Sequence, residues 1–194
     1  MNGYEKRTKL KKDSILNAAW ELFSARGISN VSISEIAAKA KVSQVSIYNY
    51  FGDKNNLAKE VLASYLDKAI KEYDEILERD IPFSEKLKLI IDSKNKATAE
   101  LSRSAFSEYA WQDKTLQQVY KEATNSKAIS VYKKFIELGK QEGAIDKSIP
   151  TDAILAYLLS SVSIVERSDY LRTSPEYKRG ILRLFFYGLF GKEE

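Results

Sequence analysis

The chain has 194 residues, of which 44% are hydrophobic and 30% are charged, and its net charge at pH 7 is +4. It contains neither histidine nor cysteine, which excludes disulfides, thiolate metal sites and the catalytic arrangements that pair histidine with serine or cysteine. It also lacks an apolar run of the about 18 residues that span a bilayer and the apolar segment of a secretion signal. We therefore expect a globular cytoplasmic protein with no membrane segment, metal, cofactor or enzymatic activity.

The positive charge is concentrated at the start of the chain. Residues 1–54 hold nine basic and five acidic residues, which is the whole net charge of +4, and residues 55–194 hold 22 of each. A positive surface attracts phosphate groups and so favours binding to nucleic acid. For residues 1–10 taken alone, a solvated and mobile tail explains the lysines equally well.

Helical periodicity dominates, with only three prolines and no sustained alternation typical of strands, so we expect an all-α protein. The first helix is predicted over about residues 11–25 and ends at Gly27. Its apolar positions are Ile15, Leu16, Ala19, Leu22 and Phe23.

The next stretch predicts two short helices separated by about three residues. Ser32 and Glu35 form a capping box that opens the first, and Ser43 offers an N-cap for the second. This spacing is typical of a helix-turn-helix, whose second helix enters the major groove of DNA.

The rest of the chain predicts longer helices. Asp53 caps one of about seven turns, Pro82 opens another, and Asp113 caps a third that continues to Gly143. The polar residues 124–126 in the middle of that third helix face either solvent or a cavity.

Two C-terminal helices are predicted to begin with Thr151 as N-cap and at Pro175, and the first is apolar or small nearly all round. Such a helix is buried on more than one side. We expect this burial to occur against a second copy, in a homodimer formed through about residues 151–190. A single central core helix is the alternative.

Residues 11–60 contain three motifs: Ile15-Leu16-x-Ala18-Ala19-x-x-Leu22-Phe23-x-x-x-Gly27, then Ser34-Glu35-Ile36-Ala37, then Val42-Ser43-x-x-Ser46-Ile47-Tyr48-x-Tyr50-Phe51-x-x-Lys54-x-x-Leu57. In these motifs the chain resembles the tetracycline-repressor (TetR) family of bacterial transcriptional regulators. The resemblance implies a three-helix DNA-binding head over residues 1–54 and a larger helical ligand-binding and dimerisation domain over residues 55–194, with about nine helices in all.

By matching position, the resemblance implies contacts of two kinds with DNA. The groove would be faced by Gln44, Val45, Ser46, Tyr48 and Asn49, and the phosphates would be held by Ser34, Tyr48, Tyr50 and Lys54. Glutamine suits adenine and valine suits a thymine methyl, whereas hydroxyls and lysine hold phosphates without reading sequence. For Tyr48 and Tyr50, a core position with a solvated hydroxyl is the alternative.

Two residues depart from the family pattern, which commonly has glycine in the turn and a smaller residue or proline at the second position of the recognition helix. Lys41 occupies the turn and would have to adopt a left-handed conformation, at a cost of roughly 1 kcal/mol. Val45 occupies the recognition helix, so a target sequence does not transfer from relatives.

The implied function is a ligand-responsive repressor that binds a palindromic DNA operator as a dimer and is released by a small molecule. An activator would use the same contacts, and a helical ligand-binding protein that does not act on DNA is a further alternative. The effector is expected to be apolar or aromatic. Its pocket would be lined by Phe106, Tyr109, Trp111, Tyr120, Asn125, Tyr132 and Tyr157, whose aromatic members could equally be core residues.

Overall fold

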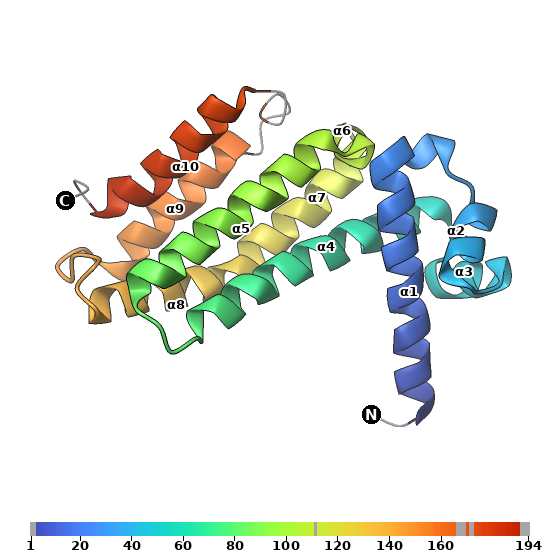
Figure 1. Cartoon of the computed structure of the whole chain (residues 1–194), viewed down its shortest axis with the longest axis horizontal. Helices are drawn as coiled ribbons and strands as arrows, with labels where there is room; N and C mark the ends of the chain where they lie inside the picture. The colour runs from blue at the N-terminus through green and yellow to red at the C-terminus, as the bar shows by residue number, and fades with distance from the viewer. Residues whose placement is uncertain (1–2, 111, 166–169, 171–172, 191–194) are drawn as a thin grey trace. The chain divides into compact units, whose positions relative to one another are not determined.

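The computed structural model describes residues 3–110, 112–165, 170 and 173–190 (Figure 1). These ranges hold ten α-helices, a 3-10 turn and a π-helical segment, without a strand, which confirms the expected all-α class. Within them, no helix combines the length and the hydrophobicity that crossing a bilayer requires.

The helices fall into two compact units. The first comprises Met1–Asp67 and Arg103–Lys121, and the second comprises Lys68–Ser102 and Glu122–Glu194. The unit that contains the predicted helix-turn-helix therefore continues past residue 54 and includes a later segment. The functional boundary between residues 54 and 55 stays a prediction.

The first unit is built on α1 (Gly3–Arg26), which packs against α2 (Ile33–Ala40) and is followed by the turn η1 (Ile28–Asn30). Helices α3 (Gln44–Phe51), α6 (Ala105–Ala110), most of α7 (Lys114–Glu122) and the start of α4 (Lys54–Leu77) complete it. Trp20 stacks on Tyr65 with ring centroids 4.2 Å apart. The larger buried side chains are Ile15, Phe23, Val31, Ile36, Ile47, Leu57 and Phe106.

Helix α1 is longer than predicted, because it begins at Gly3 and not near residue 11. Residues 3–13 are exposed apart from the half-buried Thr8, so they carry no apolar stripe from which periodicity could detect them. The lysine-rich segment over residues 3–10 is thus helical and not a coil.

The second unit consists of the end of α4, most of α5 (Phe83–Arg103), α8 (Ala128–Gln141), α9 (Thr151–Val165) and α10 (Pro175–Phe190). Its core contains Ile76, Leu77, Phe83, Ile90, Phe135, Ile136, Ile145, Ile154 and Leu158. Helices α9 and α10 lie side by side (Figure 1). Lys134 joins α8 to the end of α4 by ion pairs with Asp74 on that helix and with Glu78 directly after it, at 2.8 and 2.9 Å.

The helix predicted from Asp113 to Gly143 is interrupted. Asp113 caps its start as expected, since its carboxylate accepts hydrogen bonds from the backbone N–H groups of Thr115 and Leu116. The π-helical segment η2 (Ala123–Lys127) then separates α7 from α8. Such segments often occur at functional sites.

Thr151 was expected to cap the next helix, and this was wrong. Helix α9 begins at Thr151 itself, and the carbonyl of Pro150 accepts the first helical hydrogen bond, from the N–H of Ile154. The hydroxyl of Thr151 instead donates to the carboxylate of Glu137 at 2.7 Å and accepts from the ammonium of Lys140 at 3.0 Å.

Gly139 allows a close approach in the second unit. A Cβ atom placed on it would lie 2.7 Å from Cδ1 of Ile145 and 2.9 Å from Cζ of Phe83, closer than a Cβ atom comes to its non-bonded neighbours in real structures. After α8 the chain folds back toward Gly139, and the N–H of Ile145 donates a hydrogen bond to the carbonyl of Gly139 at 3.0 Å. The packing of Phe83 against α8 therefore requires a residue without a side chain at position 139.

Candidate nucleic-acid interface

The first helix of the motif, α2, starts with the predicted capping box. The backbone N–H of Ser32 donates to the carboxylate of Glu35 at 2.8 Å, and the N–H of Glu35 donates to the hydroxyl of Ser32 at 3.3 Å. The hydroxyl of Ser14 on α1 donates to the carbonyl of Ala40 at 2.9 Å, which fastens the end of α2 to the core helix.

The turn after α2 adopts the conformation expected of it. Lys41 has φ 56° and ψ 45°, the left-handed region, and among the described residues it is the one non-glycine residue with positive φ. Its N–H donates to the carbonyls of Ala37 and Ala38 and so ends the helix. The chain thereby reverses direction without a glycine.

Helix α3 is amphipathic in the way a recognition helix must be. Ser43 caps it by accepting a hydrogen bond from the N–H of Ser46 at 3.1 Å. Ile47 and Phe51 are buried in the core, whereas Val45 is 65% exposed and Tyr48 is 50% exposed. The polar residues Gln44 and Asn49 share the exposed side, so most of the predicted base-reading residues form one solvent-facing surface.

The predicted phosphate contacts Ser34 and Tyr50 lie at the margins of this surface. Ser34 is exposed at the start of α2, with its hydroxyl 2.8 Å from that of Ser32. Tyr50 is half-buried, and the ammonium of Lys12 lies 5.6 Å from the centre of its ring. A cation thus sits beside a predicted phosphate contact, which sequence patterning did not indicate.

Lys54, also predicted to hold a phosphate, has a structural contact. Its ammonium donates to the carbonyl oxygens of Ile28 at 3.0 Å and Val31 at 3.1 Å. It therefore joins the first turn of α4 to the connection between α1 and α2. No sequence signal pointed to this contact, because the bonded residues are 26 and 23 positions apart.

Several charges near the motif are neutralised internally. Arg26 pairs with Glu35 at 2.8 Å, and Lys39 pairs with Glu21 at 2.8 Å. Hydrogen bonds from the backbone and hydroxyl of Ser32, with a further one from Arg26, lower the pKa of Glu35 from 4.5 to about 2. The exposed bases at the N-terminal part of α1 are Lys6, Arg7, Lys9, Lys11 and Lys12.

The residues predicted to line an effector pocket lie in both units. Phe106 is fully buried in the first unit, 5.7 Å from the ring of Trp20 and 5.9 Å from that of Phe23, and is therefore a core residue there. Tyr109 packs at the edge of the same cluster, and Tyr120 is half-buried in that unit.

In the second unit, Tyr132 packs against the core, whereas Tyr157 is 41% exposed and its hydroxyl donates to the carbonyl of Leu184 at 3.3 Å. Trp111 and the side chain of Asn125 lie outside the described residues. The lining of a pocket by these residues stays a prediction.

Sequence reasoning missed a cation among aromatic rings in the second unit. The ammonium of Lys94 on α5 lies 5.3, 5.9 and 5.6 Å from the ring centres of Tyr73, Tyr132 and Phe185. The sequence did contain a signal for this burial. Lys94 stands three or four positions from Ile90, Ile91 and Ala97, and so it interrupts the apolar stripe of its helix.

Comparisons with known proteins find similarity to transcriptional regulators. The profile of bacterial regulatory proteins of the tetR family matches residues 15–61. The transcriptional repressor KstR2 of Rhodococcus jostii is 22% identical over 161 residues, which cover 81% of this chain and 78% of that protein. The regulator HbdR of Aromatoleum is 42% identical over 57 residues, which cover 29% of this chain and 25% of that protein.

The fold resembles that of solved regulators. FadR of Bacillus subtilis, solved in complex with stearoyl-CoA, aligns with a TM-score of 0.62 at 18% identity, covering 90% of this chain and 97% of that one. At this identity the likeness concerns the fold.

Proposed function

Because the chain belongs to the TetR family of bacterial transcriptional regulators, we propose that it is a repressor that binds a palindromic operator as a dimer and is released by a small molecule. One observation carries the DNA-binding part. The exposed side of α3 gathers Gln44, Val45, Tyr48 and Asn49, while its other side is anchored by Ile47 and Phe51. A short helix anchored by these two buried side chains can enter the major groove without disrupting its packing against the core.

The exposed side chains suit base recognition. The amide of Gln44 can donate to and accept from an adenine edge, and Val45 offers a methyl-sized contact to thymine. The hydroxyls of Ser34 and Tyr50 at the margins suit phosphate oxygens, which position the helix but do not read sequence. The proposed interface therefore combines a reading surface with flanking phosphate contacts.

The exposed apolar side chains of the C-terminal helices support dimerisation. Leu184 on α10 is 67% exposed and Tyr157 on α9 is 41% exposed in the single chain. Burial of such surface against a second copy is favourable, and a two-fold pair of recognition helices would meet two half-sites about one helical turn of DNA apart.

A small-molecule effector is supported by the structural relatives. The FadR structure contains stearoyl-CoA, and a structurally similar regulator of Saccharomonospora viridis was solved with choline. For the present chain we place the effector in the second unit. As a repressor it would act in the cytoplasm, where the chromosome lies, and no catalytic step is part of the proposal.

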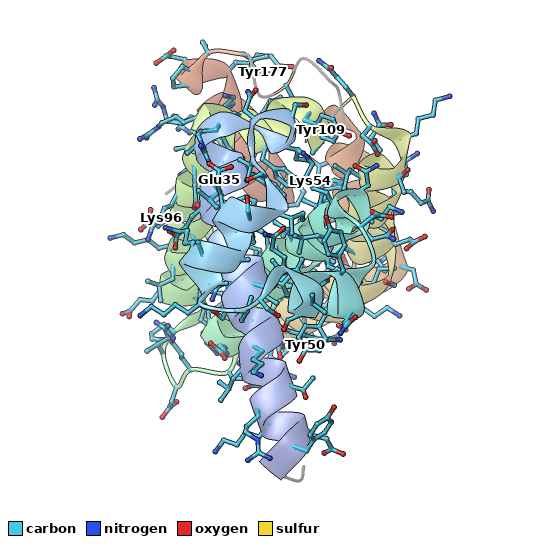
Figure 2. All side chains as sticks on the ribbon, turned by 90° about the vertical axis from the view of Figure 1, so that its right-hand side faces the viewer. Glu35, Tyr50, Lys54, Lys96, Tyr109 and Tyr177 are labelled. Carbon is cyan, nitrogen blue, oxygen red and sulfur yellow. The ribbon has the colours of Figure 1, made fainter. Side chains whose placement is uncertain are left out.

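The test is binding of the purified chain to the DNA upstream of its own gene, measured by fluorescence anisotropy over a salt series. Wild type should bind with nanomolar-range affinity that falls steeply with salt. Tyr48→Ala should lose the specific complex while its circular dichroism is unchanged. Lys96→Ala is the control, because Lys96 is exposed on α5, outside both the candidate interface and the predicted dimer segment (Figure 2).

Sedimentation velocity on the same samples reports whether each variant is a dimer, so a loss of binding through dissociation is recognised. Failure of wild type to prefer this DNA over a scrambled duplex would contradict the DNA-binding proposal. A reporter gene behind the same DNA gives the direction of control, since deletion of a repressor raises expression whereas deletion of an activator lowers it.

A further inference from the structure

The cluster around Lys94 brings one cation into a largely aromatic environment. Tyr73 comes from α4, Tyr132 from α8 and Phe185 from α10, and all three rings lie within about 6 Å of the ammonium, the distance at which ring faces attract a cation. Lys94 as a whole residue is half-buried. Within the described residues, no carboxylate forms an ion pair with it.

A buried lysine on the same helix shows how the surroundings of Lys94 differ from the usual arrangement. Lys86 is 6% exposed, and its ammonium donates to the carbonyl oxygen of Leu77 at 2.9 Å, where α4 ends. Buried lysines normally have such a partner, because an ammonium removed from water without a hydrogen bond is costly. Lys94 has rings around it but no protein acceptor within the part of the chain that the structure describes.

The surrounding polar groups are phenols. Burial raises the pKa of Tyr73 and of Tyr170, so both remain O–H donors at neutral pH. Burial acts to lower the pKa of Lys94, but the neighbouring Tyr132, Tyr73 and Tyr170 together raise it above its ordinary value, so the ammonium stays charged. A charged donor flanked by phenolic donors is chemically matched to an anion.

We propose that Lys94 binds the anionic head group, a carboxylate or phosphate, of an effector whose apolar body lies against the surrounding rings. This inference rests on the proposed function, because it names the class of molecule that releases the repressor. A neutral apolar molecule would bury the ammonium further without neutralising it, whereas an anion supplies the missing acceptor.

The same contact suggests how binding is transmitted. Tyr73 lies on α4, the helix that begins at Lys54 next to the candidate interface in sequence. An anion that draws the ammonium toward itself weakens the cation–π contact with the Tyr73 ring and changes the packing of α4. Binding of the anion and binding of DNA then favour different arrangements of one helix, which is the requirement for coupling between sites.

The test uses acids paired with their neutral esters. Dodecanoate and 2-naphthoate, each against its methyl ester, and dodecyl phosphate are titrated below micelle-forming concentrations into the full-length protein. Binding is followed by thermal shift and by isothermal calorimetry. The variants are Lys94→Met, which keeps most of the length and removes the charge, Lys94→Gln, and Lys94→Arg, which keeps the charge. Lys96→Met is the matched control, because Lys96 lies on the same helix with its side chain exposed (Figure 2).

We expect at least one acid to stabilise wild type more than its ester does. Loss of one charge-assisted contact should weaken that acid about tenfold to hundredfold in Lys94→Met, with little change in Lys94→Arg and Lys96→Met. The acid should also release wild type from its operator. Preference for the phosphate over the carboxylate would identify the head group as a phosphate.

Three results would overturn the inference: no acid binds wild type, each ester binds as well as its acid, or Lys94→Met and Lys94→Gln bind the acid as wild type does. The comparison of acid and ester needs no variant, so it tests the preference for an anionic head group even if both substitutions prevent folding. DNA binding without probe is measured in parallel. Retained operator binding with no response to acids refutes only the effector class, whereas absent operator binding refutes the proposed function.

Discussion

The ammonium group of Lys54 lies 3.0 Å from the carbonyl oxygen of Ile28, 26 residues earlier in the chain. It also bonds the carbonyl of Val31, so one side chain satisfies two acceptors in the connection between α1 and α2. This connection precedes the helix-turn-helix directly. The position of α4 in the first unit is thus set partly by Lys54, a residue for which the family resemblance implies a contact with a DNA phosphate.

Lys54→Met should therefore destabilise the protein. Hydrogen bonds from a charged donor contribute about 1.5–3 kcal/mol when removed, and partial exposure reduces this to roughly 1–2 kcal/mol here. Urea unfolding measures the change. Lys59→Met is the control, since Lys59 is a half-buried lysine on the same helix and, among the residues that the structure describes, its ammonium donates only to Asn56. A normal unfolding midpoint combined with weaker DNA binding would show that Lys54 acts on phosphate alone.

Glu35 should make the first unit sensitive to acid. Its pKa is about 2 in the folded chain against 4.5 ordinarily, because Ser32 and Arg26 bond the charged form. A depressed folded pKa means that this contribution to stability is complete above pH 4.5 and is lost as pH falls toward 2. Glu35→Gln should melt lower than wild type at pH 6, and the difference should shrink between pH 5 and 2. A difference that is constant with pH would contradict this.

Lys41→Gly should stabilise the protein. The left-handed conformation of Lys41 is strained for a residue with a Cβ atom, and glycine adopts it freely, which is expected to contribute about 0.5–1 kcal/mol. Lys41→Ala keeps the Cβ atom and serves as control, with no stabilisation expected. Thermal melts of the three proteins measure this. Equal melting of glycine and alanine variants would mean that the turn is unstrained.

Lys12→Gln should change how DNA binding depends on salt. Its ammonium lies beside the ring of Tyr50, so it is placed to meet a phosphate next to that residue. Loss of one phosphate contact lowers the slope of log affinity against log salt by about 0.9. The control is Lys96→Gln, which removes an exposed lysine from the second unit and should leave the slope unchanged. An unchanged slope in Lys12→Gln would exclude Lys12 from the interface.

Local chemistry was readable from sequence. The capping box of Ser32 and Glu35, the cap at Ser43 and the left-handed turn at Lys41 each depend on residues within four positions of one another, and all are present. The recognition side of α3 was also predicted by family resemblance, and the structure exposes it as one surface. Its contacts with bases remain predictions.

Features that depend on distant packing were not predictable. Lys54 meets carbonyls that are 23 and 26 residues away, and Lys94 meets rings from three other helices, so no short-range pattern contains either contact. The π-helical segment between α7 and α8 changes the hydrogen-bond register, and it contains no proline or glycine from which this change could be predicted. The exposed start of α1 has no apolar stripe, and periodicity therefore placed the helix too late.

The packing at Gly139 has a consequence for how this sequence varies between species. Any side chain there would collide with Ile145 and Phe83, and a collision with two core residues is not relieved by moving one flexible end. Orthologues that keep a large residue at both positions should have glycine at this site without exception. Where another residue replaces it, one of the two large partners should have become smaller in the same lineage, a compensating pair that a set of orthologous sequences would reveal.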